Sequence, residues 1–271
     1  MTQTLIIGKE SNLSQHLASK IEDSTLVSSR KIKENIEILS KYKDEKINII
    51  FNNFQASTEL NNMQDSSDYI TNSILITSKI LEYFKHSSVN KIIYTSSSSV
   101  YGNNILCSET DEVKPLNLHS SLKIANEKLI EKFCSLHNIN FTITRIFNMY
   151  GGDDKFSVIS KILNAAKNNK EITIVNSGNA IRDFIHIDDV VDMYSELLKV
   201  NVKLLNIGTG NGVSIKSLID FLHYRGVDLK VKNIQRDELK ISTADVKLLK
   251  ETLHKNTFKE LEEYLSAELH I

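Results

Sequence analysis

The segment Lys91–Lys123 reads KIIYTSSSSVYGNNILCSETDEVKPLNLHSSLK. Its apolar start, Ile92 to Tyr94, has the character of a buried strand and ends in a cluster of hydroxyl side chains. A polar loop follows, and a helix is expected to begin close to Ser120. Open α/β sheets bind their ligands at the carboxyl ends of their strands, where such a strand, loop and helix meet. The segment therefore predicts both an α/β fold and the place of its site.

Strand-like and helix-like patterns alternate along the first half of the chain. The short apolar runs that indicate strands are Gln3–Ile7, Thr25–Ser28, Lys46–Asn52, Lys91–Ser96 and Phe141–Ile146. Between them, apolar residues recur at the spacing of one helix face. This alternation predicts an α/β fold with a Rossmann-type doubly wound parallel sheet and helices on both of its faces. We expect residues 1–150 to form this dinucleotide-binding domain.

The pattern loosens after residue 150. Helices are expected over residues 156–168, 188–199, 214–224 and 256–267, with short strands near 172–175 and 184–187. We expect residues 151–271 to form a smaller C-terminal substrate-binding lobe that packs on the sheet, with an interleaved boundary between the two parts.

The composition argues against several classes of protein. Of the 271 residues, 41% are hydrophobic and 25% charged, and the net charge of −1 gives no support for nucleic acid or an anionic membrane as a partner. No run approaches the roughly 20 apolar residues of a membrane span, and the first residues lack a secretory signal pattern. Cys107 and Cys134 are too few for a disulfide framework, and no His/Cys cluster has metal-ligand spacing. We expect a cytoplasmic protein without a metal site.

The turn after the first strand reads GKESNLS over residues 8–14. A dinucleotide-binding turn needs glycines so that the backbone can approach the pyrophosphate. Gly8 keeps the first of these glycines, whereas Ser11 and Ser14 occupy the two later positions. The three residues are candidate cofactor ligands, and the alternative is an ordinary helix start with Ser11 as its cap.

The end of the second strand bears on the choice between NAD and NADP. Enzymes that prefer NAD usually carry an acidic residue there to hold the ribose. This chain has Ser28 and Ser29 followed by Arg30 and Lys31. Arg30 therefore favours the 2′-phosphate of NADP, and the alternative is an exposed basic pair.

Six segments, in order, resemble motifs of one known family. They are Asn72, Thr95–Gly102, Pro115–Lys123, Arg145–Gly151, Arg182–Val190 and Asn206–Gly210. On these residues the chain resembles the extended short-chain dehydrogenases/reductases, the family of NAD-dependent nucleotide-sugar epimerases, dehydratases and 4-ketoreductases. The resemblance implies hydride transfer between NAD or NADP and a nucleotide-activated sugar, for surface polysaccharide.

The resemblance also implies roles for single residues. Ser97 stands where the family holds the substrate oxygen, and Lys123 where it binds the nicotinamide ribose. His119 replaces the family's proton-transferring tyrosine. Tyrosine titrates near 10 and histidine near 6.5, and a neighbouring Lys123 would lower the pKa of His119 further. We expect a neutral imidazole that is a usable base and a weak acid. The alternative is a catalytically silent member that binds a nucleotide sugar or a partner protein.

The reaction type and the substrate contacts follow from the same resemblance. Ser98 and Ser99 stand where the dehydratases carry an acidic pair, which disfavours dehydration and leaves a 4-ketoreductase or 4-epimerase. Asn148, Arg182 and Arg236 match residues that hold the substrate diphosphate, whose charge suits guanidinium groups. For Arg182 the alternative is an ion pair with Asp183 or Asp188, and for Arg236 an exposed surface position. The resemblance also implies a homodimer, formed through the helices expected over residues 69–84 and 120–136.

Overall fold

The protein, seen in a computed structural model, is described over residues 2–53 and 66–271. It divides into two compact units. The first unit comprises Met1–Val100, Pro115–Arg145 and Val191–Leu205. The second comprises Tyr101–Lys114, Ile146–Val190 and Asn206–Ile271. The chain thus passes between the units several times, and a single cut at residue 150 does not describe the division.

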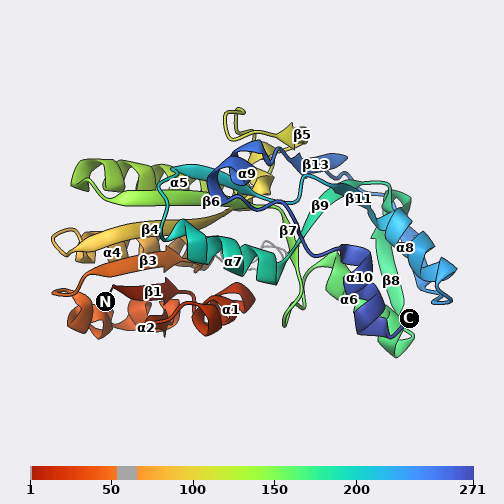
Figure 1. Ribbon diagram of the computed structural model, residues 1–271, viewed down its shortest axis with the longest axis horizontal. Helices are drawn as coiled ribbons and strands as arrows, with labels where there is room; N and C mark the ends of the chain where they lie inside the picture. Colours follow the sequence, from red (N-terminus) through yellow and green to blue (C-terminus); the bar gives the residue numbers. More distant parts are fainter. Residues whose placement is uncertain (1, 54–65) are drawn as a thin grey trace. The chain divides into compact units, whose positions relative to one another are not determined.

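The first unit is built on a six-stranded sheet with the order β10-β6-β4-β3-β1-β2 (Figure 1). Its strands are β1 Gln3–Ile7, β2 Ser24–Val27, β3 Ile47–Phe51, β4 Val89–Ser97, β6 Asn140–Ile146 and β10 Leu204–Ile207. Strand β1 pairs in parallel with β2 and with β3, and β3 pairs in parallel with β4. The strand order therefore reverses between β1 and β3, which is where doubly wound sheets open a crevice for a ligand. The α/β doubly wound fold predicted from the sequence is confirmed.

Helices cover this sheet. They are α1 Asn12–Lys20, α2 Ser29–Glu34, a 3-10 helix Ile36–Tyr42, α3 Ser66–Ile70, a π-helical turn Thr71–Leu75, α4 Ile76–Tyr83, α5 Leu118–His137 and α7 Ile187–Leu197. Alternate strand residues such as Leu5 and Ile49 pack with Ile80 of α4 and Ile130 of α5 in one core. Ile6, on the opposite face, is also fully buried. A sheet buried on both faces needs the nearly continuous apolar strands that this sequence has.

The helix expected over residues 69–84 is interrupted in the structure. Between α3 and α4 the chain makes one π-helical turn, Thr71–Leu75, which contains Asn72. The backbone carbonyl of Asn72 accepts a hydrogen bond from the side-chain amide of Asn53, at 3.2 Å. Single π turns are frequent at functional sites because they displace the residues that follow. Periodicity alone did not indicate this break.

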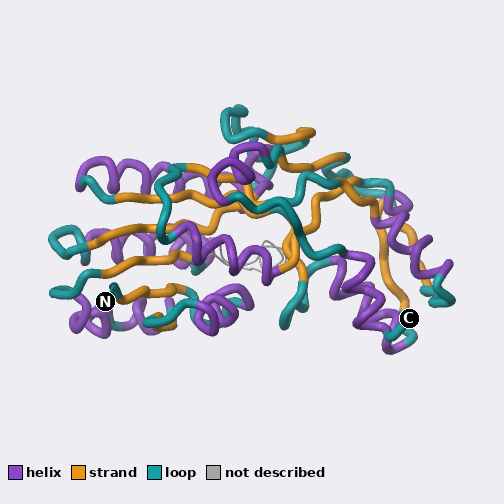
Figure 2. The backbone as a smooth tube through the Cα atoms, viewed as in Figure 1, coloured by secondary structure: helices purple, strands orange, loops and turns teal. Residues whose placement is uncertain are grey.

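The second unit combines a sheet of order β11-β9-β13-β5, with β7 paired to β9, and a two-stranded sheet of β8 and β12. Its strands are β5 Asn104–Cys107, β7 Asn148–Tyr150, β8 Glu171–Val175, β9 Ile181–His186, β11 Gly212–Ser214, β12 Lys230–Ile234 and β13 Ile241–Ala244. Its helices are α6 Val158–Asn168, α8 Ile215–Tyr224, α9 Lys247–Leu253 and α10 Leu261–Leu269. Figure 2 distinguishes strands, in orange, from helices, in purple, along the backbone. Strands β5, β7, β11, β12 and β13 and helix α9 were not predicted from the sequence.

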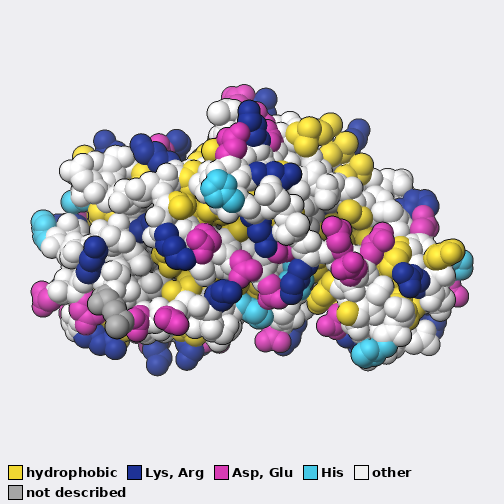
Figure 3. Space-filling model, in the orientation of Figure 1, with side chains coloured by type: hydrophobic (Ala, Val, Ile, Leu, Met, Phe, Trp, Pro, Cys, Tyr) yellow, Lys and Arg dark blue, Asp and Glu magenta, His cyan; other side chains and the backbone are white. Residues whose placement is uncertain are grey.

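The surface mixes charges of both signs. Basic and acidic side chains alternate over the face shown in Figure 3, as expected for a net charge of −1. Within the described residues, no helix combines the length and apolar character that crossing a membrane requires.

Candidate active site

Lys123 is anchored at the carboxyl end of β4. It lies on α5 with only 6% of its surface exposed, and its Nζ donates a hydrogen bond to the backbone oxygen of Thr95 at 2.7 Å. Thr95 stands two positions before Ser97, the last residue of β4. The Ser97 hydroxyl accepts a hydrogen bond from the backbone N–H of Ser99 at 3.2 Å. The predicted lysine and serine thus both lie at this strand end.

The start of α5 positions His119. Asn117 caps the helix, because its side-chain oxygen accepts from the backbone N–H of Ser120 at 2.9 Å and Ser120 reciprocates toward Asn117 N–H. Such a reciprocal capping box fixes the first turn of a helix. His119 is one turn before Lys123, so the two side chains share a helix face. The spacing of four residues between His119 and Lys123 in the sequence therefore corresponds to one turn of α5.

His119 is uncharged at neutral pH. Burial, and to a smaller extent the charge of Lys123, lowers its pKa from 6.5 to about 4. The sequence pointed to Lys123 as the cause, whereas desolvation is the larger effect in the structure. The Nδ1 atom of His119 lies 2.7 Å from the hydroxyl of Tyr69, a contact between residues 50 positions apart. No sequence pattern pointed to Tyr69.

A buried acidic residue stands on the next turn of α5. Glu127 pairs with Arg145 of β6 at two points, Nε to Oε1 at 3.2 Å and an NH2 to Oε2 at 2.8 Å, and accepts a hydrogen bond from Ser96. Burial lowers the pKa of Lys123 from 10.5 to about 7, and Glu127 opposes that shift. Glu127 was missed in the sequence, although its spacing of four from Lys123 indicates the same helix face.

The turn after β1 shows why Gly8 is required. Gly8 has φ +107°, and a Cβ at this position would lie 2.3 Å from the backbone oxygen of Asn52. Ser11 and Ser14 direct their hydroxyls inward, where both accept hydrogen bonds from the side-chain amide of Asn52, at 2.8 and 2.9 Å. Ser11 is the residue before α1, yet its side chain makes no capping bond. The capping alternative for the Ser11 side chain therefore fails, and β3 holds the turn in place.

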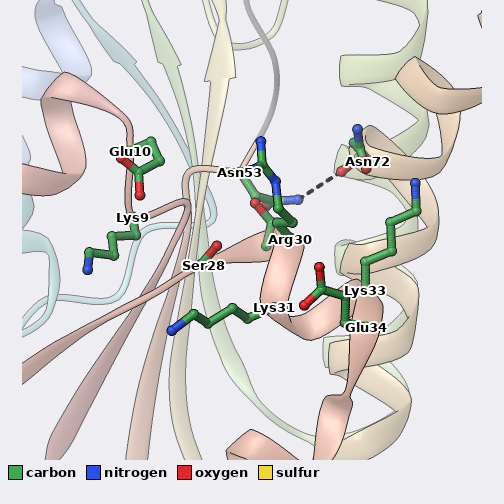
Figure 4. A pocket seen from close by; sticks show the side chains of 10 residues that line it. Lys9, Glu10, Ser28, Arg30, Lys31, Lys33, Glu34, Asn53 and Asn72 are labelled. Carbon is green, nitrogen blue, oxygen red and sulfur yellow. Dashed lines mark hydrogen bonds between the residues drawn. The ribbon is translucent and has the colours of Figure 1, made fainter.

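A cavity of about 740 Å³ opens beside this turn (Figure 4). Its lining comes from the chain after β1 and after β2, from Asn53 after β3 and from Asn72 of the π turn. The cations among the lining residues are Lys9, Arg30, Lys31 and Lys33, and the anions are Glu10 and Glu34. Arg30 is exposed and borders the cavity. Strand ends at a switch point, a close-packed glycine and an excess of cations fit a dinucleotide with its phosphates.

The three candidate substrate ligands meet in the second unit. Asn148, Arg182 and Arg236 line one cavity of about 310 Å³, together with Lys161 and Glu238. The rest of its wall is mainly apolar and includes Ile172, Ile174, Val175, Phe184 and Ile215. Concave, mostly apolar walls with a few placed polar groups are typical of small-molecule sites. Three cations against one carboxylate favour an anionic ligand here.

The sequence left open an ion pair for Arg182 and an exposed surface position for Arg236, and the structure treats the two differently. Arg182 forms an ion pair with Glu238 at 3.4 Å, rather than with Asp183 or Asp188, and donates to the backbone oxygen of Leu239 at 2.6 Å. Asp183 instead accepts hydrogen bonds from the loop after β10, with Thr209 N–H at 2.9 Å. Arg236 is exposed but lines the same cavity.

Within residues 2–53 and 66–271, no group of three or more His, Cys, Asp or Glu side chains is arranged to hold a metal ion. Ser97, His119, Lys123 and the 740 Å³ cavity belong to the first unit, and the 310 Å³ cavity belongs to the second.

Several known proteins are similar to this chain. Protein CapI of Staphylococcus aureus is 33% identical over 171 residues, which cover 61% of this chain and 51% of CapI. A putative UDP-glucose 4-epimerase of Methanocaldococcus jannaschii is 30% identical, over 70% of this chain and 66% of that protein. The chain thus spans about half to two thirds of the length of these relatives.

Among solved structures, the UDP-glucuronic acid 4-epimerase of Bacillus cereus, in complex with UDP-glucuronic acid and NAD, has the same fold. It superposes with a TM-score of 0.88 over 99% of this chain and 98% of that one, at 22% identity. Residues 9–208 match the family described as "NAD dependent epimerase/dehydratase family". That match covers more than half of the chain, and the chain therefore belongs to this family.

Proposed function

We propose that this protein transfers a hydride between a nicotinamide dinucleotide and the sugar of a nucleotide-activated sugar, as a 4-epimerase or a 4-ketoreductase. The observation that carries the proposal is the anchoring of Lys123 to Thr95 at the end of β4, with His119 one helical turn away on the same face. The names of the relatives support it, because several are epimerases or dehydratases of nucleotide sugars. None of these names favours a catalytically silent member.

Each residue has a role in this scheme. The bound dinucleotide would supply the hydride acceptor or donor. Ser97 would hydrogen-bond the reacting sugar oxygen, His119 would take or return its proton, and Lys123 would hold the nicotinamide ribose. The neutral imidazole of His119 has one protonated and one bare ring nitrogen, so it can give up one proton while it accepts another. With Ser98 and Ser99 next to Ser97, no carboxylate is adjacent to it for the elimination of water.

We propose that the 740 Å³ cavity holds the adenosine end of the dinucleotide. The related Bacillus cereus structure contains NAD, which supports a dinucleotide in this fold. The exposed Arg30, with Lys31 and Lys33 on the same wall, supports NADP because a 2′-phosphate matches a guanidinium group in charge and geometry. Gly8 would allow the backbone to approach the pyrophosphate, and Ser11 and Ser14 would hold the shape of the turn through their hydrogen bonds with Asn52.

We propose that the 310 Å³ cavity binds the nucleoside diphosphate of the substrate. Arg182 and Arg236 would pair with its phosphates, and Asn148 would orient the group between them. The side-chain amide of Asn148 already donates to the backbone oxygen of Asp183 at 3.0 Å, which holds the side chain still. The apolar wall around Ile172 and Phe184 suits the flat face of a base.

The test is turnover of UDP-sugars and dTDP-sugars with a 4-hydroxyl or a 4-keto group, in the presence of NAD or NADP, followed by chromatography and nicotinamide absorbance. Titration calorimetry with each dinucleotide and with UDP accompanies it. We expect binding of a dinucleotide and conversion of at least one sugar. Lys123→Met should abolish conversion while UDP still binds. Absence of dinucleotide binding, or of any conversion at saturating ligand, would refute the proposal.

Three further predictions from the sequence stay predictions. They are association into a homodimer, a cytoplasmic location and a role in surface polysaccharide. For the first, exposed apolar side chains lie along the two helical segments that the resemblance implicates, namely Ile70, Leu75, Leu118 and Leu136. Light scattering on the purified protein would measure the mass of the assembly.

A further inference from the structure

Tyr69 is a buried phenol that contacts the residue at the family's tyrosine position. It lies on α3, is fully buried, and its hydroxyl is 2.7 Å from Nδ1 of His119. Both residues belong to the first unit. A phenol and an imidazole at this distance are hydrogen-bonded, and the burial of Tyr69 strengthens the bond because water does not compete for its hydroxyl.

The chemistry of the two groups sets the sense of this hydrogen bond. A neutral imidazole has one N–H donor and one bare nitrogen acceptor. A phenolic O–H is a more acidic donor than an imidazole N–H, and a bare ring nitrogen is a more basic acceptor than a phenolic oxygen. Tyr69 therefore donates to Nδ1, and the ring proton of His119 stays on Nε2. Since Nδ1 faces Tyr69, Nε2 is the ring nitrogen that can face a substrate oxygen.

We propose that Tyr69 is a positioning residue that fixes the Nε2–H tautomer of His119 and supplies, through the imidazole, the phenolic proton that the family's tyrosine delivers directly. The proposal rests on the proposed hydride transfer. Tyr69 and His119 then act together. The imidazole of His119 lies between the sugar and the phenol that supplies the proton.

The proton transfers balance in the direction of reduction. As the carbonyl carbon of the sugar accepts a hydride from a reduced nicotinamide dinucleotide, its oxygen takes the proton from Nε2 of His119. Nδ1 takes the proton of the Tyr69 hydroxyl at the same time. The imidazole ends neutral with its proton on Nδ1, and Tyr69 ends as a phenolate. The Nδ1 proton then returns to Tyr69 while solvent gives one proton to Nε2, which restores the starting state. Oxidation of the alcohol runs through the same transfers in reverse.

This arrangement resolves a weakness of histidine at this position. Burial keeps His119 neutral, so it cannot deliver the proton of an imidazolium ion at pH 7. The Nε2–H of a neutral imidazole alone is a very weak acid, but a simultaneous transfer from Tyr69 makes a phenol the net proton donor. Histidine, which is a poor proton donor by itself at this position, is therefore adequate when it is paired with Tyr69.

The first test reads the tautomer without activity. Two-bond ¹⁵N–¹H NMR spectra of protein with ¹⁵N-labelled histidine, with His119→Gln for assignment, report which ring nitrogen carries the proton. We expect Nδ1 to be bare and Nε2 to be protonated at pH 7, and Tyr69→Phe to shift the Nδ1 resonance. Tyr83→Phe is the matched control, because it removes a phenolic hydroxyl that bonds Glu37 instead. A proton on Nδ1 in the wild type would overturn the proposal even if Tyr69→Phe did not fold.

The second test is a double-mutant cycle on turnover. Tyr69→Phe should lower kcat about 100-fold, the lower end of what general acid–base catalysis contributes. In the His119→Tyr background, where the ring has been replaced by a direct phenol, the same change should cost less than about 3-fold. Equal losses in both backgrounds would show a structural role and refute the relay. Absence of turnover in every protein would refute the proposed function, and the NMR result would still decide the tautomer.

Discussion

The carboxylate of Glu127 meets the guanidinium of Arg145 at two points, in a site where both side chains are at most 7% exposed. The pair joins α5 to β6, on the turn of α5 that follows Lys123. Paired charges of this kind hold each other's geometry because neither can be solvated alone. Glu127 thus joins α5 to β6 through Arg145 and also raises the pKa of Lys123 against the larger effect of burial, which lowers it.

Removing Glu127 should be costly. Glu127→Ala leaves the Arg145 charge buried without its partner, and we expect the free energy of unfolding to fall by about 3–5 kcal/mol in urea denaturation. Glu131→Ala is the matched control on the same helix, since its ion pair with Lys128 is exposed, and it should cost less than about 1 kcal/mol. Equal losses of unfolding free energy in the two variants would show that the buried pair stabilises the protein no more than the exposed pair does.

The half-buried imidazole of His119 predicts a dependence of stability on pH. The pKa of His119 is about 4 in the folded protein against an ordinary 6.5, so the unfolded chain binds more protons between these values. The stability that comes from a neutral His119 is complete above pH 6.5 and is lost as the pH falls toward 4. The difference in unfolding free energy between the wild type and His119→Gln should therefore change over this window. A constant difference from pH 4 to 7 would contradict the burial of His119.

Arg30 should discriminate between the two dinucleotides. A charge-assisted hydrogen bond contributes about 1.5–3 kcal/mol, so Arg30→Ser should weaken NADP at least about tenfold and change the affinity for NAD little. Calorimetry with both dinucleotides measures this. Arg225→Ser removes another exposed arginine, which lies far along the sequence after α8, and serves as the control. An equal loss of affinity for both dinucleotides would show that Arg30 contacts a part of the cofactor that NAD and NADP have in common.

The amide of Asn52 should matter for the phosphate-binding turn. Asn52→Ala removes the donor shared by Ser11 and Ser14, and two neutral hydrogen bonds should cost about 1–3 kcal/mol of unfolding free energy. Because the turn loses its tie to β3, dinucleotide affinity should fall as well. Asn168→Ala, whose exposed side-chain amide bonds Asn164 one turn earlier on α6, is the control for both measurements. Unchanged affinity would show that the turn holds its shape without Asn52.

Much of the fold was readable from the sequence by itself. Apolar strands such as Gln3–Ile7 and Lys91–Ser96 were predicted to within two residues, because a strand buried on both faces must be almost continuously apolar. The spacing of His119 and Lys123 was also sufficient to predict that both side chains lie on one face of a helix, since residues four apart share a helix face. The sequence missed β5 and β13, which are short strands that pair only with each other and with β9.

The tertiary structure decided what depends on contacts between distant residues. It gave His119 the buried phenol of Tyr69, gave Arg182 the carboxylate of Glu238, and turned the hydroxyl of Ser14 toward Asn52. Local periodicity carries no record of such pairs, because packing selects them only after the chain has collapsed. The sequence determined which elements form and which residues they carry. Burial and hydrogen-bond partners, which only the folded chain has, decided the charge and the orientation of those residues.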